Sequence, residues 1–380
     1  YLDVPAQIIR LRLLNGSSER SFNIGLDNNS NFNVIGTDGG LLPEPIALDQ
    51  LIISPGERYE VLIDLNNMTG DTIRIMNYGS LIPNGIYGAS IVGGMGGSSI
   101  PYYADNPLNG SDFTLLEMRI TSSTADPITT IPTSLVSVLP WNPADVNQTR
   151  EIVFSPVNMG SNGALNGPFQ FNGDPFDINV VNYEIPLNNV EIWELRNQSQ
   201  IAHPFHIHDV QFNILEINGV APPPHMQGWK DVVLVPSQNG TAKFITKFED
   251  FSDTSVPYMY HCHILTHEET GMMGQFTVVD TSSVGIGGPE ILVTDFNFHN
   301  AYPNPFNPTT TIRFSVETNT VVTLQLFDIS GKLVTTLLDK IIERGTHKIQ
   351  WNGSNQPSGI YFAVLQSGSH VETQKLILLK

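Results

Sequence analysis

The sequence predicts an all-β protein built from three consecutive β-domains, and three observations support this fold class. Short segments in which apolar and polar residues alternate recur along the whole chain, whereas long helical periodicity is nearly absent. Glycine (32 residues) and proline (26 residues) are abundant and only 14% of residues are charged, which favours turn-rich β architecture. A chain of 380 residues is too long for one ordinary core, so two or three domains are expected.

The first predicted domain covers residues 1–122. Its strands are predicted by alternating or apolar segments separated by Gly, Asn, Asp and Pro turns: QIIRLRLLN, FNVIGTDGG, LDQLIISPGERYEVLIDL and DTIRIMNYG. Residues 123–147 are rich in Thr, Ser and Pro and poor in charge. This composition predicts a linker that crosses a surface.

The second predicted domain covers residues 148–282 and the third covers residues 291–380. The second contains EIVFSPV, VEIWELRN, HPFHIHDVQFNILEING, KDVVLVP, TAKFITKF, YMYHCHIL and GQFTVVD. Residues 283–290, within TSSVGIGGPE, read as a flexible linker. The third has short strand signals such as TIRFSV, VTLQLFDI and GIYFAVLQSG, separated by NPFNP, SGK and PSG turns.

The charge balance and the cysteine count exclude several classes. A net charge of −19 argues against binding to nucleic acid and against docking on anionic lipid. No apolar run approaches the length that spans a membrane. A single cysteine excludes an internal disulfide, so bridges do not report the redox compartment.

That cysteine, Cys262, lies between two histidines in the segment HCHILTHEETGMM. Side chains on a strand alternate between its two faces, so Cys262 must point away from both neighbours. In the segment HPFHIH, the first histidine has the opposite parity to the other two. If the two segments are neighbouring strands, they form two groups: His203 with Cys262, and His206, His208, His261 and His263.

The loop after Cys262 can complete the first group. His267 lies five residues on and Met272 ten, and Gly271 eases the turn. Thiolate, two imidazoles and a weak thioether are the trigonal ligands of blue copper, whereas zinc prefers a regular tetrahedron and rarely takes methionine. We therefore predict a copper site with the ligands His203, Cys262, His267 and Met272, while Met273 packs beside it.

The second group holds four imidazoles and no thiolate, which suits copper that meets oxygen. The backbone of Cys262 joins the two sites by a short covalent path. The alternative is that Cys262 is an inert buried residue and that the histidines are ordinary surface or core residues. Their spacing and parity favour ligands. The histidines outside the motifs read as loop or tail residues: His225, His299, His347 and His370.

HPFHIH together with HCHILTHEETGMM resembles the third cupredoxin domain of the multicopper oxidases, which include laccases, bilirubin oxidases and cuprous oxidases. The segments IRLRLLNGSSERSFNIGL and FNVIGTDGGLLPEPIALDQLIISPGERYEVLIDL are similar to their middle, copper-free cupredoxin domain. The resemblance covers residues 1–280. It implies two cupredoxin-like Greek-key β-barrels or sandwiches.

The resemblance also implies a role for each metal-binding side chain. The type 1 copper, which takes electrons from substrate, would be bound by His203, Cys262, His267 and Met272. The type 2 copper would be bound by His206, and the type 3 pair by His208, His261 and His263. Glu268 matches an acidic residue that relays protons towards bound oxygen, the alternative being a solvated loop carboxylate. The implied catalytic residues are Cys262, His203, His267 and Glu268.

The family's first domain supplies four more histidines in two His-x-His pairs, which this sequence lacks. Because it also begins YLDVPAQ without an initiator methionine, we interpret it as N-terminally truncated. It would hold a complete type 1 site and half of the trinuclear cluster, and would be inactive as an isolated fragment. The alternatives are a non-enzymatic blue-copper or copper-binding module and a copper nitrite reductase, which the histidines flanking Cys262 fit less well.

In the complete enzyme, the resemblance implies one-electron oxidation of a reducing substrate coupled to four-electron reduction of O2 to water. The substrate is not specified by a motif. The nine methionines are scattered, so the methionine-rich insert of cuprous oxidases is absent. This favours phenols, aromatic amines or bilirubin-like donors.

The tail resembles the C-terminal sorting domain of bacterial type IX secretion cargo. NAYPNPFNPTTTIRFSV, VTLQLFDISGKLV and WNGSNQPSGIYFAVLQSG match its successive strands. The resemblance implies a small immunoglobulin-like sandwich, recognised by the secretion machinery through residues 291–380. The product would be secreted or attached to the cell surface, after export from the periplasm of a Gram-negative bacterium. An accessory binding sandwich is the alternative.

Overall fold

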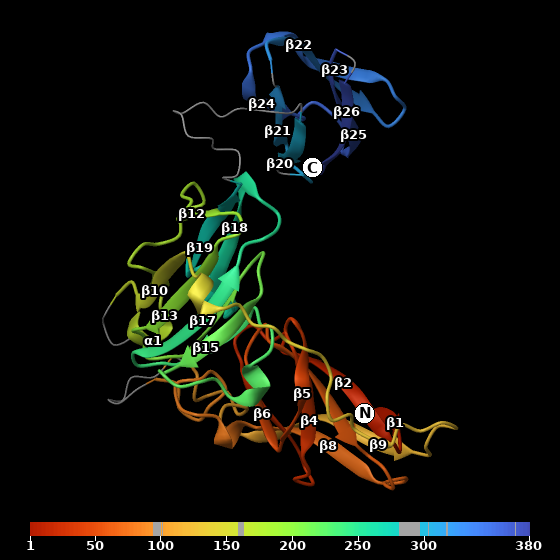
Figure 1. Cartoon of the computed structure of the whole chain (residues 1–380), viewed down its shortest axis with the longest axis vertical. Coiled ribbons are helices and arrows are strands. Elements are labelled where there is room, and N and C mark those ends of the chain that lie inside the picture. The colour runs from red at the N-terminus through yellow and green to blue at the C-terminus, as the bar shows by residue number, and fades with distance from the viewer. Residues whose placement is uncertain are drawn as a thin grey trace. The chain divides into compact units, whose positions relative to one another are not determined.

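The computed structural model describes residues 1–93, 100, 102–158, 163–280, 297–302, 304–316, 318–368 and 370–380. The chain divides into two compact units, Tyr1–Asp280 and Thr281–Lys380. Strands make up nearly all of the regular structure (Figure 1), so the predicted all-β class is confirmed. The linker predicted at residues 283–290 and the predicted start of the tail at residue 291 lie outside the described residues.

The first unit begins with a two-sheet sandwich. One sheet has the order β1-β9-β8-β3-β6 and the other β2-β7-β4-β5. The strands of the first sheet are β1 (Leu2–Pro5), β9 (Asp112–Thr121), β8 (Thr72–Tyr78), β3 (Phe22–Leu26) and β6 (Gln50–Ile53). Those of the second are β2 (Ile8–Leu14), β7 (Arg58–Asp64), β4 (Phe32–Thr37) and β5 (Gly40–Leu48).

Alternation along the strands builds the core of this sandwich. In β7, Tyr59, Val61 and Ile63 are buried while the residues between them are only partly covered. This period of two directs every second side chain between the sheets. Residues 122–147 then connect the sandwich to the next one. Their backbone bonds to Ile8 and Pro43 of the first sandwich, and the 3-10 helix η2 (Pro143–Asp145) precedes the next strand.

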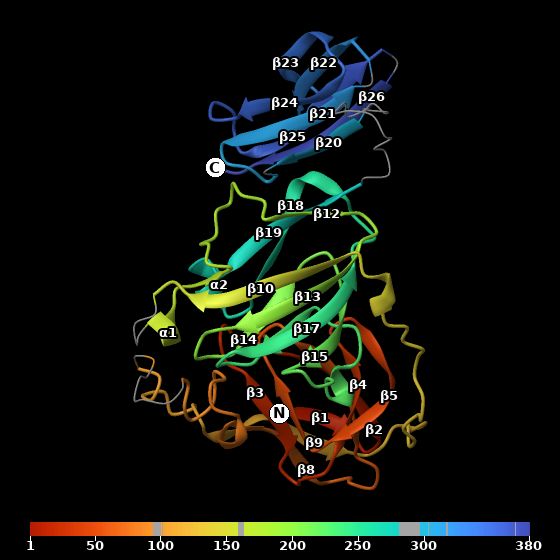
Figure 2. The ribbon, with the colours of Figure 1, turned by 60° about the vertical axis from the view of Figure 1, so that its left-hand side comes forward.

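The second sandwich has two five-stranded sheets, ordered β11-β10-β13-β17-β15 and β12-β19-β18-β14-β16. Figure 2 shows β10, β13, β17 and β15 side by side as one layer. The first sheet contains β11 (Phe169–Phe171), β10 (Gln148–Pro156), β13 (Val190–Asn197), β17 (Gly240–Lys247) and β15 (Phe212–Ile217). The second contains β12 (Tyr183–Pro186), β19 (Met273–Val279), β18 (Asp253–Cys262), β14 (His203–Ile207) and β16 (Val232–Val235).

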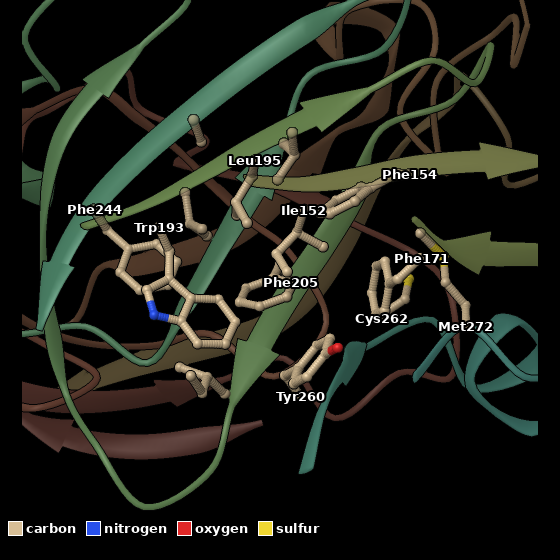
Figure 3. Close-up of a cluster of buried hydrophobic side chains, with 14 of the residues drawn as sticks. Ile152, Phe154, Phe171, Trp193, Leu195, Phe205, Phe244, Tyr260, Cys262 and Met272 are labelled. Atoms are coloured by element: carbon tan, nitrogen blue, oxygen red, sulfur yellow. The ribbon is translucent and has the colours of Figure 1, made fainter. Parts of the chain in front are cut away.

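The core of the second sandwich is aromatic and reaches the cysteine. Trp193, Phe205 and Tyr260 pack together in its centre, and Cys262 and Met272 lie at one end of the same cluster (Figure 3). All five side chains are fully or almost fully buried. The site therefore rests on a tightly packed base that limits how far its side chains can move.

Among the described loops of the first unit, four short helical segments occur besides η2: η1 (Gly79–Leu81), α1 (Gly163–Asn166), η3 (Pro224–Met226) and α2 (Leu265–Glu269). The sequence predicted a plain loop after Cys262, whereas the chain forms the single turn α2 there. A five-residue helix is too short to show helical periodicity, so the pattern could not reveal it. Gly271 follows with φ +105°, as the predicted turn requires.

The second unit is a small sandwich of a three-stranded and a four-stranded sheet, ordered β20-β21-β24 and β23-β22-β25-β26. Its strands are β20 (Asn297–Tyr302), β21 (Thr309–Val316), β24 (Gly345–Asn352), β23 (Leu333–Ile342), β22 (Thr320–Asp328), β25 (Gly359–Ser367) and β26 (His370–Leu378). Phe314, Leu324, Trp351 and Leu365 contribute to its core. In the described part of the whole chain, no helix has the length and apolar character needed to cross a membrane.

Candidate metal centre

The two histidine-bearing segments are neighbouring antiparallel strands, as the sequence analysis required. In the β14–β18 ladder Phe205 pairs with Cys262, and His206 pairs with His261. Paired residues on adjacent strands point to the same face. Cys262 therefore points into the core with Phe205, and His261 points with His206 to the opposite face.

The first group is compact. The Sγ atom of Cys262 lies 3.5 Å from Nδ1 of His203 and 3.6 Å from Nδ1 of His267. All three residues are buried, and their ligand atoms lie within 4.8 Å of one another. The ring of Phe169 packs edge-on against both imidazoles, at centroid distances of 4.7 Å to His203 and 4.6 Å to His267. Three soft or borderline donors thus converge in a buried pocket.

Met272 is tied to this group through the backbone. The Cys262 amide donates to the Met272 carbonyl at 3.1 Å, and the Met272 amide donates to the His267 carbonyl at 2.9 Å. Its side chain is fully buried and packs in the cluster that contains Cys262 (Figure 3). Met273 instead begins β19 opposite His261 and is only partly buried. Met272 is thus the methionine placed in the core with Cys262.

Burial sets the protonation of the first group. It lowers the pKa of His203 well below its ordinary value and that of His267 to about 3, so both imidazoles are neutral at pH 7. Burial also raises the pKa of the Cys262 thiol. Neutral imidazoles are ready to bind a metal, and the thiol releases its proton when it becomes a ligand. Two imidazoles, one thiol and a nearby thioether fit copper better than zinc.

The second group forms a cluster of imidazoles on the opposite face. Nε2 of His208 lies 3.2 Å from Nε2 of His261, and ligand atoms of His206, His208 and His261 lie within 4.8 Å of one another. The ring of His263 is centred 5.5 Å from those of both His206 and His261. Burial lowers the pKa values of His206 and His208, and that of His261 to about 3. These three side chains therefore offer neutral nitrogen ligands.

Glu268 lies beside this cluster. Its Oε2 is 3.2 Å from Nδ1 of His261, which also lies 3.1 Å from the Cys262 carbonyl. Burial raises the pKa of the Glu268 carboxyl and so favours its protonated form. The side chain is 29% exposed, so it contacts solvent and the cluster at once.

A cavity of about 600 Å³ opens beside His267. The first sandwich and the loop after β8 supply most of its lining, including Glu19, Arg20, Tyr87 and Tyr103. Thr266 of α2 closes it on the other side and donates to Oε1 of Glu19 at 2.9 Å. Tyr87 packs edge-on against His267 at 5.9 Å. A ligand in this cavity would meet the edge of one imidazole of the first group.

Sequence reasoning missed several side chains that shape these sites. Ser199 contacts Nε2 of His203, and its position four residues before that histidine is the one local signal that could have identified it. Glu19 and Tyr87 belong to a different sandwich from the motif. Their approach depends on how the sandwiches pack, so no local spacing could have revealed it.

Family models match three parts of the chain. Residues 4–82 and 139–282 each match a model described as multicopper oxidase, and residues 300–379 match the secretion system C-terminal sorting domain. The first match covers most strands of the first sandwich, up to β8, and the second match covers the second sandwich. The third carries the small sandwich, so this part indicates an exported protein.

Curated relatives agree with these matches. A multicopper oxidase of Staphylococcus epidermidis is 33% identical over 284 residues, which are 73% of this chain and 50% of the relative. The laccase of Bacillus subtilis is 26% identical over 74% of this chain and 52% of its own length. The cell division protein FtsP of Photorhabdus laumondii is 31% identical over 73% and 52%. The chain thus spans about half the length of these relatives.

Solved structures agree as well. A laccase-like multi-copper oxidase from Ochrobactrum has a TM-score of 0.60 and 33% identity, covering 73% of this chain and 57% of that one. The McoA multicopper oxidase of Aquifex aeolicus has a TM-score of 0.58 and 28% identity, covering 73% and 56%. Fold and sequence thus lead to one conclusion: through its first 280 residues this chain belongs to the multicopper oxidase family, and it ends in a type IX secretion sorting domain.

Proposed function

We propose that this chain supplies the type 1 copper site and four imidazoles of the oxygen site of a laccase-like multicopper oxidase. One observation carries the proposal. The Cys262 thiol converges with His203 and His267 in a buried pocket, while His261, next to it in the chain, joins an imidazole cluster on the opposite face. A metal-linked thiol placed one residue from a second ligand cluster is suited to passing electrons from one site to the other.

In this proposal His203, Cys262, His267 and Met272 hold the first copper, and His206, His208, His261 and His263 contribute to the oxygen site. Copper bound in the first group would accept electrons one at a time from a donor and, when reduced, pass them on. His267 faces the cavity and provides the route in, and Cys262 and its backbone provide the route to His261. The surrounding aromatic side chains exclude water from the thiol.

We assign the cavity beside His267 to an aromatic donor that loses a proton as it loses an electron. Tyr87 and Tyr103 offer ring faces and edges, and the carboxylate of Glu19 can accept a phenol or arylamine hydrogen. Glu19 is held by Thr266, which immediately precedes His267. The similar Ochrobactrum enzyme is described as having oxidase activity towards lignin model compounds and lignosulfonate, which supports this donor class.

Proton delivery to the oxygen site falls to Glu268 in this proposal. The carboxyl contacts both solvent and Nδ1 of His261, so it can take a proton from water and release it beside the imidazole cluster. Its raised pKa keeps it closer to the range in which such transfer is efficient.

The oxygen site is incomplete within this chain. By the family resemblance it needs four further imidazoles, and among the described side chains no other histidine joins the cluster. We therefore propose that the chain alone does not reduce oxygen. A blue-copper electron-transfer module is the second candidate, because the complete ligand set lies in the first group.

The tail supports export by the type IX secretion machinery, with residues 291–380 as the part recognised. We propose that the protein is secreted from a Gram-negative bacterium or attached to its surface. Its copper sites would then meet donors and oxygen outside the cell.

Copper titration of the purified chain tests the proposal. One equivalent should give an intense blue absorption, and Cys262→Ser should abolish it, because only thiolate ligation gives this band. Further copper should bind the imidazole cluster with a distinct electron paramagnetic resonance signal that His208→Ala removes. No blue colour would refute the type 1 site. A blue chain with no cluster signal would favour the electron-transfer module over the oxidase.

A further inference from the structure

A network of charged side chains joins the two sandwiches next to the imidazole cluster. Arg58, at the start of β7, belongs to the first sandwich, which contains none of the proposed copper ligands and is called the copper-free sandwich below. Its guanidinium donates two hydrogen bonds of 2.6 Å to the two carboxylate oxygens of Asp231, which immediately precedes β16 in the other sandwich. It also donates to the Gly56 carbonyl at 3.0 Å and to the Asp38 carbonyl at 3.1 Å. This paired, planar geometry is specific to arginine.

Asp231 transmits this contact to one imidazole. Its carbonyl oxygen lies 2.8 Å from Nδ1 of His206, and its carboxylate lies 3.8 Å from the same nitrogen. Because the carbonyl can only accept, Nδ1 carries the hydrogen and Nε2 is left free to bind a metal. The position of Asp231 thus sets both the orientation and the tautomer of His206.

Gly56 brings the same network to a second imidazole. Its φ is +83°, and a Cβ atom built there would lie 2.4 Å from Cδ2 of the His263 ring and 2.6 Å from its Nε2. The backbone of the copper-free sandwich therefore lies directly against His263. Arg58 donates to the Gly56 carbonyl and so holds this backbone in place. One guanidinium therefore contacts both Asp231, which lies against His206, and Gly56, which lies against His263.

Buried ion pairs hold Arg58 and Asp231 in register. The fully buried ammonium group of Lys230 lies 2.9 Å from Oδ2 of Asp38 and 3.0 Å from Oε1 of Glu57. Asp38 also accepts from the backbone amides of Arg58, at 2.8 Å, and Asp231, at 3.3 Å. A buried charge pair is costly to break because the remaining charge would be unpaired. The network therefore resists sliding of one sandwich over the other.

We propose that Arg58 is a positioning residue through which the copper-free sandwich orients His206 and His263 for copper. The proposal rests on the oxygen site assigned above. It gives the copper-free sandwich a part in the metal chemistry although it offers no ligand itself. An ordinary interface ion pair would stabilise the fold but would not determine the tautomer of a cluster imidazole.

Two measurements on the full chain separate these roles. The first needs no copper: nitrogen-15 spectra of the histidine rings report which nitrogen of His206 carries the hydrogen. The wild-type chain should show the Nδ1–H form. Arg58→Met, which keeps an unbranched apolar stem but removes the guanidinium and its donors, should show a mixture of tautomers. Arg58→Lys should fall between the two because it keeps the charge without the paired geometry.

The second measurement is the affinity for Cu²⁺ at the cluster, followed by the paramagnetic resonance signal that His208→Ala removes. Arg58→Met should weaken this affinity by about 10- to 100-fold, the usual effect of losing a partner that orients a ligand. The blue absorption of the first site should be unchanged. Arg74→Met is the matched control, because Arg74 pairs with Asp27 and Glu117 in the same sandwich away from the cluster.

The outcomes distinguish this inference from the proposed function. If Arg58→Met keeps the wild-type tautomer of His206 and the wild-type Cu²⁺ affinity, Arg58 is not a positioning residue. If Arg58→Met changes the tautomer of His206, but neither the wild-type chain nor any variant binds copper at the imidazole cluster, the positioning role stands and the proposed oxygen site fails. Arg58→Met could instead unfold the chain, losing both copper sites and the circular dichroism spectrum of the folded protein, while Arg58→Lys keeps them. That result would also overturn the inference, in favour of a structural role for Arg58.

Discussion

The hydroxyl oxygen of Ser199 lies 2.8 Å from Nε2 of His203, while Nδ1 of the same ring faces the Cys262 thiol. The hydroxyl hydrogen of Ser199 has two carbonyl acceptors in reach, Asn197 Oδ1 at 2.7 Å and the Ile201 carbonyl at 2.9 Å. Its oxygen is therefore free to accept from Nε2–H. Ser199 thus selects the tautomer in which Nδ1 can bind copper.

Ser199→Ala should weaken this selection and leave a buried nitrogen without its partner. We expect the free energy of unfolding of the copper-free chain to fall by about 1–3 kcal/mol. Copper affinity at the first site should fall by about tenfold or more. Urea unfolding and a copper competition titration measure the two effects. Ser54→Ala is the control, since the Ser54 hydroxyl is buried but has no hydrogen-bond partner among the described residues. Equal behaviour of the two variants would contradict the assignment.

Met272→Leu should raise the reduction potential of the first copper. The thioether donates some electron density to oxidised copper, and leucine removes it at nearly constant volume. Stability should change by less than about 1.5 kcal/mol. Redox titration of the blue band measures the effect, and Met273→Leu is the matched control. If the potential is unchanged in Met272→Leu but shifts in Met273→Leu, Met273 and not Met272 is the thioether ligand.

Glu19→Gln should slow electron transfer from phenols but not from donors that lose no proton. The amide keeps the size of the side chain but is a poor proton acceptor. Anaerobic bleaching of the blue band by a phenol should slow by on the order of 10²-fold, the lower end of the range for positioned acid–base groups. Bleaching by a metal-complex reductant should be unaffected. If both donors slow equally, Glu19 acts on the copper site and not on the phenol.

The copper-loaded chain should be blue and should turn over no oxygen with a phenolic donor. Electrons should reach the first copper and remain there, because the cluster has four of the imidazoles that the family resemblance requires. An oxygen electrode measures this directly, with added laccase as a positive control. Sustained uptake by the chain alone would show that its own four imidazoles suffice.

His225 should make the copper-free chain less stable in acid. Burial, and next the charge of Lys230, lower its pKa from 6.5 to about 4. Above pH 6.5 it is neutral whether the chain is folded or unfolded. Between about 6.5 and 4 the unfolded chain binds a proton that the folded chain does not, so stability is lost as pH falls.

His225→Gln removes this contribution. Comparing urea midpoints at about pH 7 and about pH 5 should therefore give a smaller loss for the variant than for the wild type. The other histidines are the same in both proteins and contribute equally, so the difference isolates His225. An identical loss in both would show that His225 is protonated in the folded chain.

The sequence alone determined the all-β class and the division of the candidate metal ligands into two groups. Both follow from the two-residue period of a strand, which is local: His203 and Cys262 have the parity that points them into the core, and His206 and His261 the opposite parity. The spacing from Cys262 to His267 and Met272 is local too. The chain after Cys262 turns back on itself within ten residues, and backbone hydrogen bonds join Cys262 to Met272 and Met272 to His267.

Only the tertiary structure decided what surrounds these groups. Glu19 meets Thr266, and Arg58 meets Asp231, across more than 170 residues, and Gly56 lies against His263. These contacts depend on the packing of one sandwich against the other. The free energy of that packing is the sum of many weak van der Waals contacts spread over two surfaces. No periodicity within a strand encodes it. The chemistry of the ligands is therefore local in the sequence, whereas their access to a donor and their orientation are set by the packing of distant segments.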